Sequence, residues 1–242
     1  MSGPRAEGRR GVLTDRPLEL GHAGRDAPEP RQQLTDDVYE RLRRAIVRGE
    51  LRPNQRLIEA DLAQRLEVSR TPIREALQRL TLDRLVVSQR RCWVVREHRP
   101  DEIREIYECR MALEGHAARL ATERATGDEV RALDEILAGA DLGRPPRQWM
   151  VPVNDAFHQA VIEAARNPML AELCERSRLY YFNHRIAALY TREEAAESRD
   201  QHLRLRDAIR DRHPADAESL AHLHIATALR VLLHHLDEGL TP

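Results

Sequence analysis

The sequence predicts a mainly α-helical protein with one short β-hairpin, divided into an N-terminal and a C-terminal domain. Three observations predict this fold class. Beyond residue 33, apolar residues recur mostly at three- and four-residue spacing, the period of amphipathic helices. Strand-like sequence is confined to residues 85–95. Residues 34–99 contain 15 Arg and 10 acidic residues and residues 100–242 contain 18 Arg and 25 acidic residues, so a basic block precedes an acidic one.

The composition of the 242-residue chain argues against several classes of protein. The chain is 41% hydrophobic and 4% aromatic, and its net charge is -1. No apolar run approaches the ~20 residues of a membrane span, and the N-terminus lacks the apolar stretch of a signal peptide. We therefore expect a cytoplasmic protein that does not contact the membrane. The three cysteines are scattered and form no CxxC pair, which argues against a disulfide framework and a thiolate zinc site.

Residues 1–33 contain Gly, Pro and charges of both signs without hydrophobic periodicity. Such a segment has no apolar face to bury, so we expect a disordered N-terminal tail. The first domain is then expected over residues 34–99 and the second over residues 100–242.

The first domain is expected to contain three helices and a hairpin. These elements are a helix capped by Thr35 and ending at Gly49, helices over Glu59–Leu66 and Arg70–Leu82, and a hairpin over residues 85–95 with its tip at Gln89–Arg91. Ser69 is a natural N-cap for the third helix, and Pro72 falls in its first turn, where the missing N–H costs nothing. Two short helices joined by a tight turn and followed by a hairpin are typical of a winged helix-turn-helix domain.

The third helix has the chemistry of a DNA-reading element. Arg70, Thr71 and Arg74 project in one direction from its first turns, and Arg can pair with guanine O6 and N7 in the major groove. The Ser69 and Thr71 hydroxyls and the free N–H groups of the helix start suit phosphates. The hairpin tip, Arg90–Arg91, can reach an adjacent minor groove or the backbone; alternatively, these two arginines are solvated surface residues.

The second domain is expected to be an all-α antiparallel bundle. Its helices are expected over residues 101–122, 127–140, 148–165, 168–190, 193–211 and 214–239. Short connections between successive helices favour antiparallel neighbours.

The N-terminal domain resembles the GntR family of bacterial repressors. The resemblance rests on Val38–Ile46, Gly49–Pro53, Arg56–Glu59, Leu62–Ala63 and Val68–Leu80, of which Ser69–Leu77 (SRTPIREAL) is highly specific. It implies that Ser69, Arg70, Thr71 and Arg74 lie on the recognition helix and touch double-stranded operator DNA.

The sequence departs from the GntR pattern at four positions. The family usually has Gly at the positions of Asn54 and Arg84, and many relatives have Arg at the position of Ala60. The wing has Arg91–Cys92 where the family has Arg-Gly, and Cys tolerates a positive φ poorly. This departure bears on the path of the wing turn and on any DNA contact made from it.

The second domain contains nine of the eleven histidines. Asn154 and His158 share a helical face, as Asp155 and His158 could, whereas His222 and His224 point about 200° apart around a helix. Inward histidines with an oxygen ligand suit zinc, nickel or similar ions. From spacing alone, however, histidines are more often surface residues or satisfied core residues than metal ligands.

The second domain resembles the FCD ligand-binding domain of the FadR-like branch of GntR regulators, in its shorter, six-helix VanR-like form. The matching segments are Ile106–Arg110, Leu113–Glu114, Asn154–His158, Ala165–Leu170, His202–Ile209 and His224–Ile225. The resemblance implies a divalent metal, zinc in preference to nickel or manganese, held by Asn154, His158, His202 and His224. Many relatives have Asp at position 154, so an amide ligand implies weaker affinity unless Asp155 takes its place. In the match to the family pattern, His224 falls at the position of the third metal-binding histidine, and His222 does not.

The resemblance also implies a small carboxylate effector and a homodimer. Arg110 matches a chamber-facing position and could pair with the effector; an ion pair with Glu114, four residues on, is the alternative. Tyr180, Tyr181 and Asn183 are further candidates for the chamber wall. The sequence therefore predicts a DNA-binding transcriptional regulator, most simply a repressor, and not an enzyme. Two alternatives remain open, a histidine-metal hydrolase in a helical bundle and a DNA-binding protein without an effector.

Overall fold

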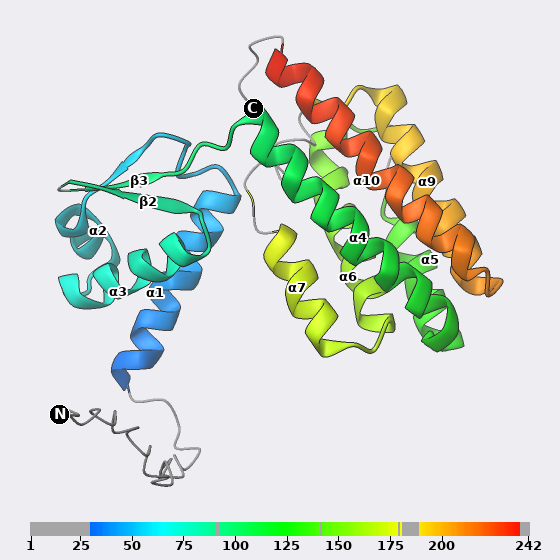
Figure 1. The fold of residues 1–242 in the computed structure, drawn as a ribbon, viewed down its shortest axis with the longest axis horizontal. Helices are drawn as coiled ribbons and strands as arrows, with labels where there is room; N and C mark the ends of the chain where they lie inside the picture. Colours follow the sequence, from blue (N-terminus) through cyan, green and yellow to red (C-terminus); the bar gives the residue numbers. More distant parts are fainter. Residues whose placement is uncertain (1–29, 91, 141, 179, 181–188, 238–242) are drawn as a thin grey trace, which may run out of the picture.

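The computed structural model describes residues 30–90, 92–140, 142–178, 180 and 189–237 (Figure 1). Most of the expected tail lies outside this range. The first helix, α1 (Pro30–Val47), starts before the expected domain boundary. The predicted helix cap at Thr35 is therefore wrong, because Thr35 lies inside α1 and donates its hydroxyl hydrogen to Glu75 Oε2 at 2.9 Å.

The N-terminal domain is a winged helix-turn-helix. After α1 come β1 (Arg56–Leu57), α2 (Glu59–Leu66), α3 (Arg70–Leu82), β2 (Val86–Gln89) and β3 (Cys92–Val95). The bounds of α2 and α3 are those that the sequence predicts. The sheet is antiparallel in the order β1-β3-β2, with Trp93 opposite both Leu57 and Ser88. The sequence analysis missed β1 because two residues are too few for a periodic signal.

One apolar core holds this domain together. Its fully buried members come from the inward faces of α1 and α3, from the sheet and from the turn before β2: Val38, Ile46, Leu57, Ile73, Ala76, Leu77, Leu80, Leu85, Val86 and Val95. The inward face of α3 is consequently packed against α1, and its outward face is left to solvent. This arrangement positions the first turns of α3 for contact with another molecule.

Two of the departures from the GntR pattern coincide with left-handed backbone. Asn54 and Arg84 have φ values of 63° and 58°, so both occupy the conformation that glycine adopts most easily. In the wing turn the positive φ of 42° falls on Arg90, and Cys92 begins β3 in extended conformation. The hairpin therefore forms without requiring a strained cysteine.

The C-terminal domain is a helical bundle. Its described helices are α4 (Pro100–Arg124), α5 (Gly127–Ala138), α6 (Pro146–Ala164), α7 (Pro168–Arg178), α9 (Arg192–Arg210) and α10 (Pro214–Asp237). α4 and α10 lie side by side along most of their length (Figure 1). The helix expected over residues 168–190 ends as α7 at Arg178, and most of the remainder lies outside the described residues. Within the described ranges, no helix has the length and apolar character needed to span a membrane.

The helix α7 lies between the bundle and the N-terminal domain (Figure 1). Arg43 of α1 donates from Nη2 to Glu175 Oε1 of α7 at 2.9 Å. The His98 ring, in the segment that leads into α4, meets the Tyr180 ring edge to face with 4.9 Å between centroids. Tyr180 thus lies at the domain junction, and Tyr181 and Asn183 lie outside the described residues.

Candidate nucleic-acid interface and candidate metal centre

The start of α3 presents a polar surface to solvent. Ser69, Arg70, Thr71 and Arg74 are all exposed there, and the Arg70 and Arg74 side chains are 63% and 55% exposed. Ser69 occupies the N-cap position, as the sequence predicts, but its side chain makes no capping hydrogen bond. The hydroxyl and the first N–H groups of α3 are therefore available to an external acceptor such as a phosphate oxygen.

Glu59, the first residue of α2, organises these arginines. Arg74 donates to it twice, from Nε to Oε1 at 3.0 Å and from Nη2 to Oε2 at 2.7 Å. Arg70 Nη2 lies 3.4 Å from Oε2, and Trp93 of the wing donates from Nε1 to Oε1 at 3.3 Å. Hydrogen bonding to Arg74 is the largest cause that lowers the pKa of Glu59 to about 2. Sequence reasoning missed Glu59 because these partners lie 11, 15 and 34 residues away.

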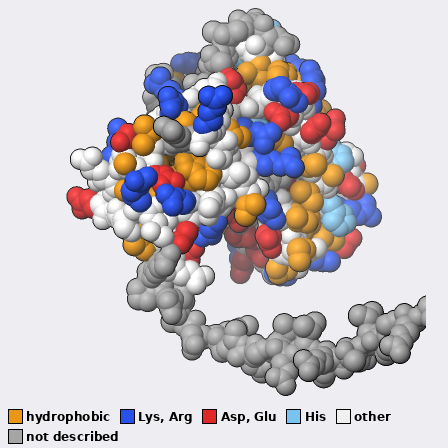
Figure 2. Space-filling model, turned by 60° about the vertical axis from the view of Figure 1, so that its left-hand side comes forward, with side chains coloured by type: hydrophobic (Ala, Val, Ile, Leu, Met, Phe, Trp, Pro, Cys, Tyr) orange, Lys and Arg blue, Asp and Glu red, His pale blue; other side chains and the backbone are white. Residues whose placement is uncertain are grey.

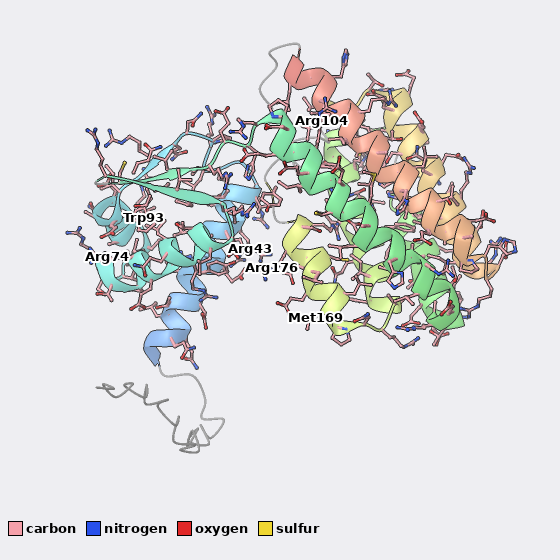
Figure 3. All side chains as sticks on the ribbon, viewed as in Figure 1. Arg43, Arg74, Trp93, Arg104, Met169 and Arg176 are labelled. Carbon is pink, nitrogen blue, oxygen red and sulfur yellow. The ribbon has the colours of Figure 1, made fainter. Side chains whose placement is uncertain are left out.

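The wing contributes one described arginine to the surface of this domain. Arg90 is exposed at the turn between β2 and β3; Arg91 lies outside the described residues. Figure 2 turns the N-terminal domain toward the viewer and shows basic side chains on its surface with acidic ones among them. Figure 3 places Arg74 and Trp93 on the side of this domain that faces away from the bundle.

Three histidines converge inside the bundle. His158 of α6, His202 of α9 and His224 of α10 are each no more than 5% exposed, and their ligand atoms lie within 4.8 Å of one another. Nε2 of His202 lies 3.1 Å from Nε2 of His224. The structure thus brings together the three histidines that the family resemblance selects. His222, as expected, lies elsewhere, against Gly115 of α4.

Neighbouring side chains determine which nitrogen of two rings is protonated. Glu114 Oε2 lies 2.7 Å from His158 Nδ1, and a carboxylate only accepts hydrogen bonds. Gln201 donates to Thr227 Oγ1 at 3.2 Å, which directs its Oε1 toward His224 Nδ1 at 3.0 Å. Both rings therefore carry the proton on Nδ1 and direct an Nε2 lone pair inward, the arrangement that ordinary metal-binding histidines show.

The electrostatics keep the three imidazoles neutral. Burial lowers the pKa of His158, and it lowers the pKa values of His202 and His224 further, well below the ordinary value. Burial alone would raise the pKa of Glu114, but the charges of Arg110 and Arg178 and the hydrogen bond from His158 hold it well below its ordinary range. A neutral imidazole is the form that binds metal, so this cluster is ready to act as a ligand set at neutral pH.

The donor atoms fit a divalent ion. His158 Nε2 is buried and has no hydrogen-bond partner within the described part of the chain, which is costly unless something binds it. Zinc–nitrogen bonds of about 2.0–2.1 Å at tetrahedral angles separate adjacent nitrogens by about 3.3 Å, close to the His202–His224 spacing. Asn154 is one turn before His158 on α6 and half-buried. Its role as a fourth ligand, taken from the family resemblance, stays a prediction.

Two arginines adjoin the histidines. Arg110 donates from Nε to Glu114 Oε1 at 2.9 Å, so the ion pair that the sequence left as an alternative is present. Arg178 of α7 is 14% exposed and lies 3.3 Å from Asp155 Oδ1, and its charge lowers the pKa values of all three histidines. Sequence reasoning missed Arg178, since 39 arginines give no reason to select one.

Comparison with known proteins agrees with both halves of the structure. The model of the bacterial regulatory proteins of the gntR family matches residues 34–94, and that of the FCD domain matches residues 105–227. The Nta operon transcriptional regulator of Aminobacter aminovorans is 31% identical over 72% of this chain and 82% of its own length. The HTH-type transcriptional repressor GlaR of Escherichia coli is 28% identical over 81% of this chain and 94% of its own length. The solved structure of E. coli McbR/YncC superposes on this structure with a TM-score of 0.72 and 26% sequence identity. The match covers 84% of this chain and 98% of the McbR/YncC chain.

Proposed function

Since the chain belongs to the GntR family of DNA-binding transcriptional regulators and contains an FCD domain, we propose that it is a repressor controlled by a small carboxylate. The effector would bind at a divalent metal ion inside the bundle and release the operator. The observation that carries this proposal is the buried group of His158, His202 and His224, in which His158 Nε2 has no hydrogen-bond partner among the described residues. A relative described as a repressor supports the sign of regulation.

DNA reading is assigned to the N-terminal domain. Arg70 and Arg74 would contact base edges from the major groove, and Ser69 and Thr71 would bind phosphates. Arg90 and Arg91 of the wing would reach the backbone or the minor groove. One such domain makes few base contacts, so we propose a homodimer that reads two half-sites, which supplies the affinity and specificity that an operator requires.

The metal would be held by His158, His202, His224 and Asn154, with zinc favoured over nickel or manganese. When bound, it supplies a Lewis-acidic position for a carboxylate oxygen. Glu114 and Gln201 orient two of the histidine ligands, as outer-shell groups do in metal sites. The Arg110 and Arg178 guanidiniums supply positive charge for the rest of the anion.

The helix α7 is proposed to transmit binding to the DNA-binding domain. Arg178 and the buried Cys174 lie on its bundle side, whereas Glu175 holds Arg43 of α1. An anion that draws Arg178 away from Asp155 would therefore shift the helix that supports α1. Release of the operator then requires the effector to favour one domain arrangement over the other.

The hydrolase alternative is excluded, because the family and the relatives are transcriptional regulators and not enzymes. A metal-binding bundle in this chain is accordingly a sensing site. An effector-independent DNA-binding protein remains the competing outcome in the experiment below.

The test combines metal analysis with DNA binding. Tag-free protein purified without chelator should contain close to one metal ion per chain, and His158→Ala should contain none. A duplex selected by the wild-type protein from random-sequence DNA should be released by one member of a panel of mono-, di- and tricarboxylates. Arg70→Ala and Arg74→Ala should each weaken binding to this duplex by about 1–3 kcal/mol per lost base contact. Metal-free protein after reloading, or release by no carboxylate, would reject the sensing mechanism.

A further inference from the structure

We propose that Glu59 determines the DNA sequence specificity of this protein by orienting Arg74 and, more weakly, Arg70. Glu59 does not read bases itself and acts as a positioning residue. The inference rests on the assignment of Arg74 as a base-reading residue in the proposed function. It adds that reading depends on an acidic side chain of a different helix.

The contact between Glu59 and Arg74 occupies one edge of the guanidinium. Nε and Nη2 of Arg74 both donate to the carboxylate, at 3.0 Å and 2.7 Å, in a bidentate pair. The N–H groups that remain are those of Nη1 and the outer hydrogen of Nη2, which lie at the end of the side chain. Guanine presents two acceptors, O6 and N7, in the major groove, and this end of the guanidinium matches them. Glu59 thereby selects one of the ways in which Arg74 can approach a base.

Glu59 is rigid enough to act as such a guide. Its side chain is 14% exposed, whereas that of Arg74 is 55% exposed. It begins α2, where the helix dipole favours a negative charge. The Trp93 indole of β3 donates to Oε1 at 3.3 Å, so the carboxylate is held from the wing as well as from α2. The two arginines are exposed, and Glu59 is the partly buried group that they bind.

The charge of Glu59 opposes non-specific binding. A carboxylate beside two arginines reduces the local positive charge that attracts phosphates. It remains ionised at neutral pH, because its bond to Arg74 lowers its pKa to about 2. Loss of this charge should strengthen binding to any DNA, while loss of orientation should weaken the preference for guanine. Loss of Glu59 should therefore leave affinity for a non-specific duplex unchanged or higher while it lowers discrimination at the specific duplex. A purely structural role of Glu59 would not produce this combination.

The test compares Glu59→Gln with two variants of the full-length protein. Arg74→Ala identifies the base pair that Arg74 reads. Asp61→Asn is the matched charge control, because Asp61 is an exposed acid in the same turn of α2 and makes no described ion pair. The probes are a duplex selected from random-sequence DNA by the wild-type protein, its single base-pair substitutions, and a scrambled duplex of equal length. Thermal unfolding of each variant verifies that it is folded.

We expect Glu59→Gln to reduce discrimination at the Arg74 base pair at least tenfold while binding the scrambled duplex as tightly as the wild type or up to several-fold more tightly. Asp61→Asn should strengthen binding to the scrambled duplex similarly and leave discrimination unchanged. Trp93→Phe, which removes the indole donor, should produce a smaller loss of discrimination. Wild-type discrimination in Glu59→Gln, with a clear loss in Arg74→Ala, would overturn this inference alone. Wild-type behaviour of Arg74→Ala would instead overturn the assignment of the recognition helix.

Discussion

Several arginines of this chain occupy backbone conformations that usually belong to glycine. Arg84, Arg90, Arg166 and Arg212 all have positive φ values. For two of them the side chain compensates, because it binds carbonyls at the end of another helix: Arg212 Nη2 donates to Ala125 O at 2.7 Å, and Arg166 donates to the carbonyl of Arg124. Among the described residues, the Arg84 side chain makes no hydrogen bond of this kind to a carbonyl. The left-handed conformation there is a local cost that the surrounding fold imposes.

Arg84→Gly is therefore expected to stabilise the protein. Removing the Cβ relieves a strain of about 1–2 kcal/mol, from which the greater flexibility of unfolded Gly subtracts about 0.5–1 kcal/mol. The melting temperature should rise by about 2 °C. Asn54→Gly is the control, because Asn tolerates the left-handed region and its Nδ2 donates to Glu97 Oε2 at 2.6 Å. This variant should not gain stability, and an equal rise in both would contradict the explanation.

The stability of the domain junction should depend on pH through His98. Burial, with help from the charges of Arg96 and Arg84 and against that of Glu102, lowers the pKa of His98 to about 4. Below pH 6.5 the unfolded chain binds a proton that the folded chain does not, so stability is complete above pH 6.5 and decreases as the pH falls toward 4. The decrease from this residue is roughly 3 kcal/mol at most.

Melting temperatures measured from pH 7.5 to 4.5 would check this prediction. His98→Phe keeps a ring against Tyr180 and should show a flatter decrease than the wild type. The buried histidines of the bundle titrate equally in both proteins and cancel in the comparison. His213→Asn is the control, since the His213 side chain is 62% exposed and lies outside the domain junction. Parallel curves for His98→Phe and the wild type would show that the junction does not sense this proton.

At the scale of the helices, close contact between α4 and α10 depends on one glycine. A Cβ at Gly115 would lie 2.3 Å from His222 Nε2, well inside van der Waals contact. The two helices approach here because α4 has no side chain at this position. This contact lies one helical position from Glu114 on α4 and two from His224 on α10, so it influences the spacing of the histidine cluster. His222, which is not part of the histidine cluster, thus has a packing role.

Gly115→Ala is expected to destabilise the protein by about 1–3 kcal/mol, because the added methyl group displaces the His222 ring. Chemical denaturation would measure the loss. His222→Ala removes the obstructing ring, so the added methyl group should cost much less in that background than in the wild type. If the cost of Gly115→Ala is the same with and without His222, the steric explanation is incorrect.

At the scale of the whole molecule, α7 is the element that touches both functional regions. Figure 3 shows Arg43 of α1 beside Arg176 of α7 at the junction of the two domains. The two like charges are accommodated because Arg43 is held by Glu40 and Glu175, at 3.1 Å and 2.9 Å. Glu175 therefore connects the DNA-binding domain to the helix whose other face borders the histidine cluster.

Glu175→Gln should weaken regulation more than stability. An ion pair this exposed contributes about 0–1 kcal/mol to the free energy of unfolding, so the melting temperature should change little. The ratio of operator affinities without and with the active carboxylate should fall several-fold, because α7 would lose its charged contact with α1. Glu172→Gln, on the same helix, should leave that ratio unchanged. An unaltered ratio in Glu175→Gln would remove this ion pair from the coupling mechanism.

Much of this protein follows from local sequence pattern. The bounds of α2 and α3, the hairpin and the helical character of the second domain all arise from periodicity and turn residues, which act over a few positions. The division of charge follows from composition alone. The resemblance to GntR and FCD proteins then selected His158, His202 and His224 among nine histidines of that domain, and the structure brings them together. Spacing alone could not have done so, because they come from three different helices.

Only the tertiary structure decided how these residues are held. Glu59 binds Arg74 across 15 positions, Glu114 orients His158 across 44, and Arg178 reaches the cluster from α7. Such partners are determined by how helices pack, and a single sequence contains no periodic signal for a contact between elements. The left-handed conformation of Arg84 is likewise imposed by the surrounding fold. Local propensity determined the helices and strands of this protein. Packing between these elements determined which charged side chains contact its functional residues.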